Sequence, residues 1–188
     1  MNSGYYLEKS FDKCKVLTEG EYENCVFNNC DLDNGDLSGF AFIDCTFSAC
    51  NLSMAKLNKT AFREVKFINC KLLGLRFDTC HDFGLSFSFE GCQLDHSVFF
   101  KTKILKTSFV NTQLKGVDFT EADLSSAVFN NCDLADAVFD RTNLEKADFR
   151  TAVNYSIDPE INRMKKARFS MPGIAGLLDK YGIQIDTI

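Results

Sequence analysis

The sequence has no tryptophan and two prolines in 188 residues, and no apolar run in it reaches the roughly 18 residues that a membrane-spanning helix needs. Its first 20 residues lack a basic start followed by an apolar run, so we expect no secretory signal. The nine cysteines are therefore interpreted as reduced thiols of a cytoplasmic protein. The net charge of −5 argues against a general affinity for nucleic acid or for an acidic membrane.

Residues in a pattern that would indicate catalysis are also scarce. The two histidines, His81 and His96, have no serine or cysteine nucleophile at motif spacing. The 11 glycines are scattered and form no phosphate-binding loop. We therefore predict a protein that is not an enzyme and that uses no cofactor or metal.

What the sequence does contain is a repeat of five residues. In residues 119–149, FTEADLSSAVFNNCDLADAVFDRTNLEKADF, a large apolar residue returns at every fifth position. A period of five fits neither the 3.6-residue period of a helix nor the two-residue period of a strand. Two uninterrupted runs of such centres extend from Leu17 to Phe77 and from Phe89 to Phe149. A fixed repeat of this kind predicts a stacked architecture.

A larger period of 20 residues lies over the period of five. Phe27, Phe47 and Phe67 are each 20 positions apart, which predicts four repeats per turn and a square-sided coil. Successive turns would then pair like parallel strands. Phe77 and Phe89 are 12 positions apart where two repeats need 10, so we expect a two-residue insertion within about 81–88 that bulges at one corner.

The cysteines follow the same period. All but Cys14 are assigned to the small inward position two residues before a centre. A zinc site usually needs closely spaced pairs, such as two cysteines separated by two residues, that converge as four ligands. The pattern instead favours cysteine as a small buried core residue.

Both ends of the chain depart from the repeat. Residues 1–16 fit it poorly and are predicted to cap the open end of the stack. Asp158-Pro159 has the form of a helix start, with proline at the first helical position. Apolar residues at the spacing i, i+3, i+4, i+7 then predict one helical face: Ile174, Leu177, Leu178 and Tyr181. We divide the chain into an N-terminal cap (1–16), a coil (17–149) and a C-terminal cap or dimerisation helix (150–188).

Four segments share one motif, a small residue, Asp or Asn, Leu, and two variable residues: ADLSS (122–126), CDLAD (132–136), CNLSM (50–54) and CDLDN (30–34). The run resembles the pentapeptide-repeat family. The resemblance implies an all-β fold, a right-handed quadrilateral parallel β-helix, here with a short C-terminal α-helix. The tail is similar to that of the quinolone-resistance class, in which it joins two rods end to end. This implies a homodimer through the helical face defined above, with a lid on its own coil as the alternative.

The best-known members of that family bind type II topoisomerases as rods with the shape and negative charge of DNA. The resemblance thus implies DNA gyrase or topoisomerase IV as partner. Residues 17–55 hold seven acids and no base, 56–115 ten bases and five acids, and 116–149 eight acids and two bases. The pattern predicts a rod with two acidic ends and a basic waist. Candidate partner-binding residues in the acidic ends are Asp31, Asp33, Asp36, Asp118, Asp123, Asp133 and Asp136.

The same residues bear on two other functions. A structural or protein-interaction solenoid with an unrelated partner would use apolar residues that face outward, among them Ile43, Ile68 and Leu105. An enzyme of the pectate-lyase kind would need a carboxylate cluster on one face. The tightest acidic group, which contains Asp31 and Asp36, spans adjacent sides of the coil, so the sequence disfavours this alternative.

Overall fold

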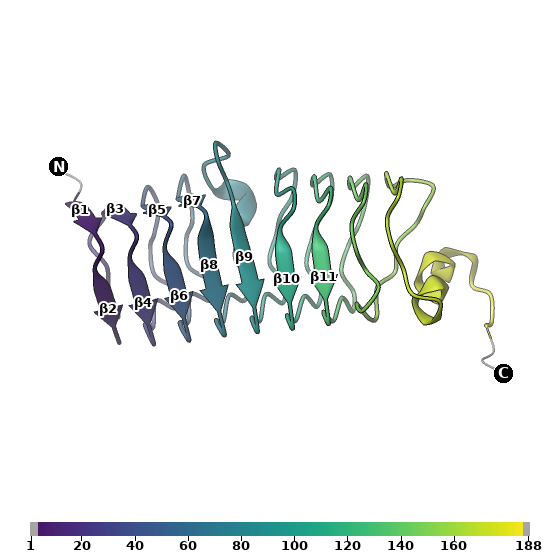
Figure 1. Cartoon of the computed structure of the whole chain (residues 1–188), viewed down its shortest axis with the longest axis horizontal. Helices are drawn as coiled ribbons and strands as arrows, with labels where there is room; N and C mark the ends of the chain where they lie inside the picture. Colours follow the sequence, from purple (N-terminus) through teal and green to yellow (C-terminus); the bar gives the residue numbers. More distant parts are fainter. Residues whose placement is uncertain (1–3, 186–188) are drawn as a thin grey trace.

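In a computed structural model that describes residues 4–185, the chain winds into a rod of stacked coils (Figure 1). Each strand pairs in parallel with the strand one coil away, in the orders β1-β3-β5-β7 and β11-β10-β9-β8-β6-β4-β2. The predicted parallel β-helix is confirmed. The strands are β1 (Gly4–Leu7), β2 (Ser10–Asp12), β3 (Gly20–Glu23), β4 (Val26–Asn28), β5 (Ala41–Ile43), β6 (Thr46–Ser48), β7 (Ala61–Arg63), β8 (Val65–Ile68), β9 (Phe87–Glu90), β10 (Ser108–Val110) and β11 (Val128–Asn130).

The five-residue repeat sets which side chains point inward. Phe109 and Thr107, a centre and the residue two positions before it, are both buried, whereas their neighbour Ser108 is only half-buried. Asn111 and Asn131 follow their centres by two residues and turn the chain at the corner with φ of 50° and 52°. Asparagine tolerates this left-handed conformation better than most residues. The Asn131 amide also donates to the Asn111 Oδ1 at 3.2 Å, so that the corners of successive coils are joined.

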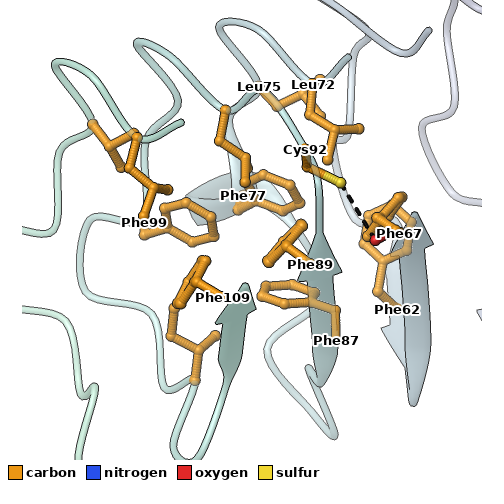
Figure 2. Close-up of a cluster of buried hydrophobic side chains, with 14 of the residues drawn as sticks. Phe62, Phe67, Leu72, Leu75, Phe77, Phe87, Phe89, Cys92, Phe99 and Phe109 are labelled. Atoms are coloured by element: carbon orange, nitrogen blue, oxygen red, sulfur yellow. Dashed lines mark hydrogen bonds between the residues drawn. The ribbon is translucent and has the colours of Figure 1, made fainter. Parts of the chain in front are cut away.

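A column of stacked phenylalanine rings runs inside the coil, along one of its sides. Successive rings stack with centroids 4.4–5.4 Å apart: Phe11, Phe27, Phe47, Phe67, Phe89, Phe109, Phe129, Phe149 and Phe169. Figure 2 shows three of them, Phe67, Phe89 and Phe109, with rings of the neighbouring side packed edge-on. Stacked and edge-to-face pairs both add to the gain from burying apolar area. The interior is therefore a packed core along the length of the rod.

The predicted two-residue insertion is confirmed by the register of the strands. Phe47 pairs with Phe67, 20 positions on, but Val65 pairs with Phe87, 22 positions on. The chain forms a 3₁₀ helix, η1 (Phe77–Thr79), and then a loop that Figure 1 shows projecting beside β9. The rest of each coil keeps its alignment because the extra residues are confined to this corner.

The coil extends past both expected limits, 17 and 149. At the N-terminus β1 and β2 pair with β3 and β4 at an offset of 16 residues, so residues 4–12 form a shorter first coil. At the other end Arg163 pairs with Asn143 and Arg168 with Asp148. Residues 1–3 of the expected cap and 186–188 of the expected C-terminal segment lie outside the described residues.

The C-terminal helical segment differs in kind and start from the prediction. It consists of two 3₁₀ helices, η2 (Pro172–Leu177) and η3 (Asp179–Tyr181), and the described chain contains no α-helix. Pro172 lies at the start of η2. Pro159, at which the sequence predicts a helix start, lies in a turn. These helices are too short to cross a bilayer, and no other described helix is long enough.

Close packing of the C-terminal segment on the last coil explains its path. A Cβ at Gly176 would lie 2.1 Å from the Tyr155 carbonyl oxygen, so glycine is what permits this approach. The Ile157 N–H also donates to the Gly176 carbonyl at 2.9 Å. A 3₁₀ helix has three residues per turn, so Ile174 and Leu177 fall in one row and the expected four-residue face is not formed. Leu177 packs against the core, as a lid on the coil requires.

Candidate functional site

Within residues 4–185 the inside of the coil is filled by packed apolar side chains, and hollows lie on the surface. One such hollow, of about 610 Å³, lies where η2 meets the last coil and is lined by Arg150, Tyr155 and Asp179 among others. In residues 4–185 no group of three His, Cys, Asp or Glu side chains is placed to hold a metal ion. The arrangement therefore offers surfaces for binding.

The cysteine thiols serve the core. All nine are free, and seven are buried. The thiol of Cys92 donates to the Phe67 carbonyl at 3.3 Å, as Figure 2 shows, and Cys132 donates likewise to Phe109 at 3.4 Å. Burial raises the pKa of Cys132 to about 11, so the thiol stays protonated and keeps its donor. Cys80 follows η1 at the insertion and is only half-buried, although it still packs against the core.

The three predicted N-terminal acids lie on two adjacent sides of the rod. Asp31 and Asp33 flank the buried Leu32 and Asp36 precedes the buried Leu37 on the next side; all three acids are exposed. Hydrogen bonds from the Ser38 side chain and N–H lower the pKa of Asp36, which keeps it ionised well below neutral pH. Within the described chain, no acid between residues 17 and 55 forms an ion pair with a basic side chain.

The charge density of this region resembles that of DNA. Residues 17–55 make about two turns, which at the parallel-strand spacing occupy about 10 Å of the rod axis. Their seven acids give about one charge per 1.4 Å, against about one per 1.7 Å for duplex DNA. We call residues 17–55 the acidic end.

The four predicted C-terminal acids lie in a different setting. Asp118, Asp123 and Asp133 are half-buried, and each accepts a hydrogen bond from the N–H two residues later at 2.9–3.1 Å. These carboxylates stabilise corners of the coil. Asp136 is exposed. Asp31 and Asp133 are five coil-to-coil steps apart, about 24 Å, so the structure does not bring the seven predicted acids together.

Arginines beyond residue 149 form ion pairs with acids of the second acidic segment, residues 116–149. The Glu145 carboxylate lies 2.8 Å from Arg163, and the Asp148 carboxylate lies 2.8 Å from Arg150 and 3.3 Å from Arg168. Ending the coil at 149 left these arginines out of the sequence interpretation. The repeat resumes as Ala167-Arg168-Phe169, 20 positions after Ala147-Asp148-Phe149, and that signal was present in the sequence.

The predicted dimer residues are divided between the lid and the surface. Ile174 and Tyr181 are 38% and 54% exposed. Leu177 and Leu178 are half-buried, Leu177 against the core. Two of the four residues are thus exposed, although the Tyr181 hydroxyl donates a hydrogen bond to the Glu160 carboxylate at 2.9 Å.

The rod is similar to known proteins over most of its length. The family model described as "Pentapeptide repeat region" matches residues 21–87 and 82–149. A full-length structure of QnrB1, a plasmid-mediated fluoroquinolone resistance protein, is similar with a TM-score of 0.57 and 19% identity, over 96% of this chain and 100% of that chain. No curated protein sequence matches this chain.

A second solved structure is as similar in fold. HetL, a pentapeptide repeat protein involved in heterocyst differentiation regulation from the cyanobacterium Nostoc sp. strain PCC 7120, has a TM-score of 0.57 and 14% identity, over 89% of this chain and 84% of that chain. At these identities the two likenesses establish the fold alone.

Proposed function

Because this chain belongs to the pentapeptide-repeat family, we propose that it acts by binding, as a DNA-mimicking rod that occupies the DNA groove of a type II topoisomerase such as DNA gyrase or topoisomerase IV. In this role it would act in the cytoplasm and alter the response of the topoisomerase to quinolones. The proposal needs no catalytic group, cofactor or metal.

The observation that supports this proposal is the acidic end. Asp31, Asp33 and Asp36 are exposed on two adjacent sides of the rod, and the whole region has the linear charge density of a duplex. A groove that binds DNA presents basic side chains for phosphates, and a rigid array of carboxylates meets the same side chains. The packed core holds these carboxylates on strands and corners at fixed spacing, which lowers the ordering cost of binding.

A supercoiling assay with purified DNA gyrase tests the proposal. We expect the wild-type protein to change gyrase supercoiling, or to relieve its inhibition by a quinolone, in a dose-dependent way. Replacing Asp31, Asp33 and Asp36 together by Asn should raise the concentration needed by about tenfold or more, because three charge-assisted contacts are lost. Asn retains the shape of each side chain, so the fold is expected to be unchanged.

The matched control is the variant with Asp118, Asp133 and Asp136 replaced by Asn. It removes the same number of charges from the other half of the rod, where we expect less than a threefold effect. No inhibition and no protection by the wild-type protein over a wide concentration range would rule out the proposal. Equal losses in both variants would show that net charge, and not the acidic end, governs binding.

For the C-terminal segment we propose a second copy of this chain as partner, joined end to end. Exposed apolar side chains at this end support it: Ile174, Tyr181 and Met171 are 38%, 54% and 81% exposed. Ile174→Asp is expected to convert a dimer into a monomer, because it places a charge in the apolar contact. Analytical ultracentrifugation measures the mass.

The control for this prediction is Asn130→Asp, which adds one charge at an exposed position on the side of the rod. It should leave the dimer intact. Leu177→Asp is a poorer test because Leu177 packs against the core. A wild-type protein that sediments as a monomer, or an unchanged dimer mass for Ile174→Asp, would contradict the proposed dimer.

The alternative function is a protein-interaction solenoid with an unrelated partner. The equal fold similarity to HetL and to QnrB1 favours neither function, so the surface has to decide. This alternative would use outward apolar residues, of which Leu105 is 52% exposed while Ile43 and Ile68 are half-buried. A pull-down that returns only topoisomerase subunits would count against it.

A further inference from the structure

Asn34 is the one asparagine of the sequence that a glycine follows, and it lies inside the acidic end. It is exposed and turns the chain at a corner with φ of 54°. The Gly35 N–H donates to the Leu32 carbonyl at 3.0 Å and closes this turn. A Cβ at Gly35 would lie 2.9 Å from the same carbonyl oxygen, so the fold itself favours glycine after Asn34.

This pair of residues can react without an enzyme. Because glycine has no Cβ to shield its backbone nitrogen, the Gly35 nitrogen can attack the side-chain amide carbon of Asn34. A bond forms from the Gly35 nitrogen to Asn34 Cγ, and the bond from Cγ to Nδ2 breaks. The amide takes up the proton of the Gly35 nitrogen and leaves as ammonia. Water then opens the five-membered imide at either carbonyl, which gives aspartate or isoaspartate. Both products carry one negative charge where Asn34 carried none.

The folded corner gives this reaction access to both groups. Asp33 and Asn34, the central residues of the turn, are exposed. Exposed turns open locally at a low cost in free energy, and opening releases the Gly35 nitrogen from the Leu32 carbonyl. The Asn34 N–H donates to the Ser53 carbonyl of the next coil at 2.9 Å, which holds the rest of the corner in place. We therefore expect the reaction to occur in the folded chain, more slowly than in an unfolded one.

An aspartate fits this corner. Asp136 occupies the same corner five coils further on, with φ of 58° against 54° for Asn34. The bridges that join Asp31 to Asp133 coil by coil place these two corner residues in one column. Asp and Asn both tolerate the left-handed conformation. The new carboxylate would stand beside Asp33 and raise the number of acids in the acidic end from seven to eight.

We propose that Asn34 is a site of spontaneous deamidation, and that its conversion to a carboxylate strengthens the binding of the acidic end to a basic groove. The second part rests on the proposed function, whereas the first does not. An added carboxylate meets the same basic side chains as its neighbours do. Water is the only co-reactant, so the charge accumulates with the age of the protein.

Peptide mapping by mass spectrometry tests the modification. The full chain is kept in mildly alkaline buffer, since the attacking nitrogen must lose its proton. We expect Asn34 to deamidate at least about tenfold faster than Asn58 and Asn154, which are also exposed but precede lysine and tyrosine. Asn34→Gln should remove the reaction at this corner, and Met54, with φ of 57° in the same column, shows that a long side chain fits there. Deamidation of Asn34 at the rate of Asn58 and Asn154 would overturn the inference.

The gyrase supercoiling assay tests the consequence with Asn34→Asp. We expect this variant to act at a concentration about two- to threefold lower than the wild-type protein, because one charge-assisted contact is added. Asn130→Asp adds the same charge at an exposed position outside the acidic end and should leave that concentration unchanged. Circular dichroism checks the fold of each variant.

The two assays fail in different ways. A wild-type protein that acts on gyrase, with no gain from Asn34→Asp or an equal gain from Asn130→Asp, would overturn the effect on binding. If the wild-type protein and both variants leave gyrase unchanged, the proposed function fails and the effect on binding falls with it. Peptide mapping decides the modification of Asn34 in either case.

Discussion

Replacing Phe67 by alanine is expected to lower the free energy of unfolding by about 3–5 kcal/mol, because a buried ring is lost and a cavity remains. Phe67 is 1% exposed and lies near the middle of the phenylalanine column. Its ring stacks on Phe47 and Phe89 at 5.3 and 5.4 Å and meets Phe62 edge-on at 5.7 Å. The backbone around it is tied to the coils on both sides, so it cannot collapse fully into the space. Urea-induced unfolding followed by circular dichroism measures the loss.

The control for this prediction is Phe83→Ala. Phe83 is 73% exposed, so its loss should change stability by less than about 0.5 kcal/mol. A loss below about 1 kcal/mol for Phe67→Ala would contradict the role given to the stacked column. A loss confined to the coils next to residue 67 in hydrogen exchange would show that the coils unfold independently of one another.

Asn162→Ala is expected to lower the free energy of unfolding by about 2–4 kcal/mol, because one buried side-chain amide joins three parts of the backbone. Its Nδ2 donates to the Phe139 and Asp158 carbonyls, both at 2.9 Å, and its Oδ1 accepts the Thr142 N–H at 2.8 Å. Alanine would fit the inward position but would leave buried backbone groups without partners. Thermal unfolding monitors the change.

Asn58→Ala is the matched control, because Asn58 is exposed and the hydrogen bond of its side-chain amide to the Ser38 hydroxyl is long at 3.5 Å. It should change stability by less than about 0.5 kcal/mol. If Asn162→Ala is no more destabilising than this control, the buried amide is not what holds the last coil. Faster proteolysis of the C-terminal segment in Asn162→Ala is the expected local consequence.

The middle of the rod could be predicted from the sequence in detail. The repeat of five fixes which side chains point inward, and the 20-residue period fixes the stacking of Phe27 on Phe47 on Phe67. The insertion followed from counting, since Phe77 and Phe89 are two residues too far apart for the repeat. These inferences succeed because in a stacked coil position along the chain determines position in space.

The ends of the rod were harder to predict. The coil continues beyond 149 although Asn162 occupies a position at which the repeat usually has a small residue. The Asn162 amide hydrogen-bonds the backbone of the previous coil in its place. The helix was expected as an α-helix because apolar spacing alone cannot show that Gly173 and Gly176 must lie against Tyr155. That contact depends on tertiary packing.

The candidate surfaces, too, could be predicted from the sequence only in part. The lack of bases between residues 17 and 55 is a property of the sequence, and it remains the main support for the acidic end. The pairing of Glu145 with Arg163 could not be read without knowing that the coil continues.

The most direct measurement of the central proposal is a competition between this protein and duplex DNA for gyrase. Labelled linear DNA is bound to gyrase, and the protein is added at several salt concentrations while DNA anisotropy is followed. Occupation of the same groove predicts complete displacement of the DNA, with an apparent affinity that falls as salt rises, because the contacts are charge pairs. A stable complex that contains gyrase, DNA and this protein together, with no DNA released at saturation, would contradict the account.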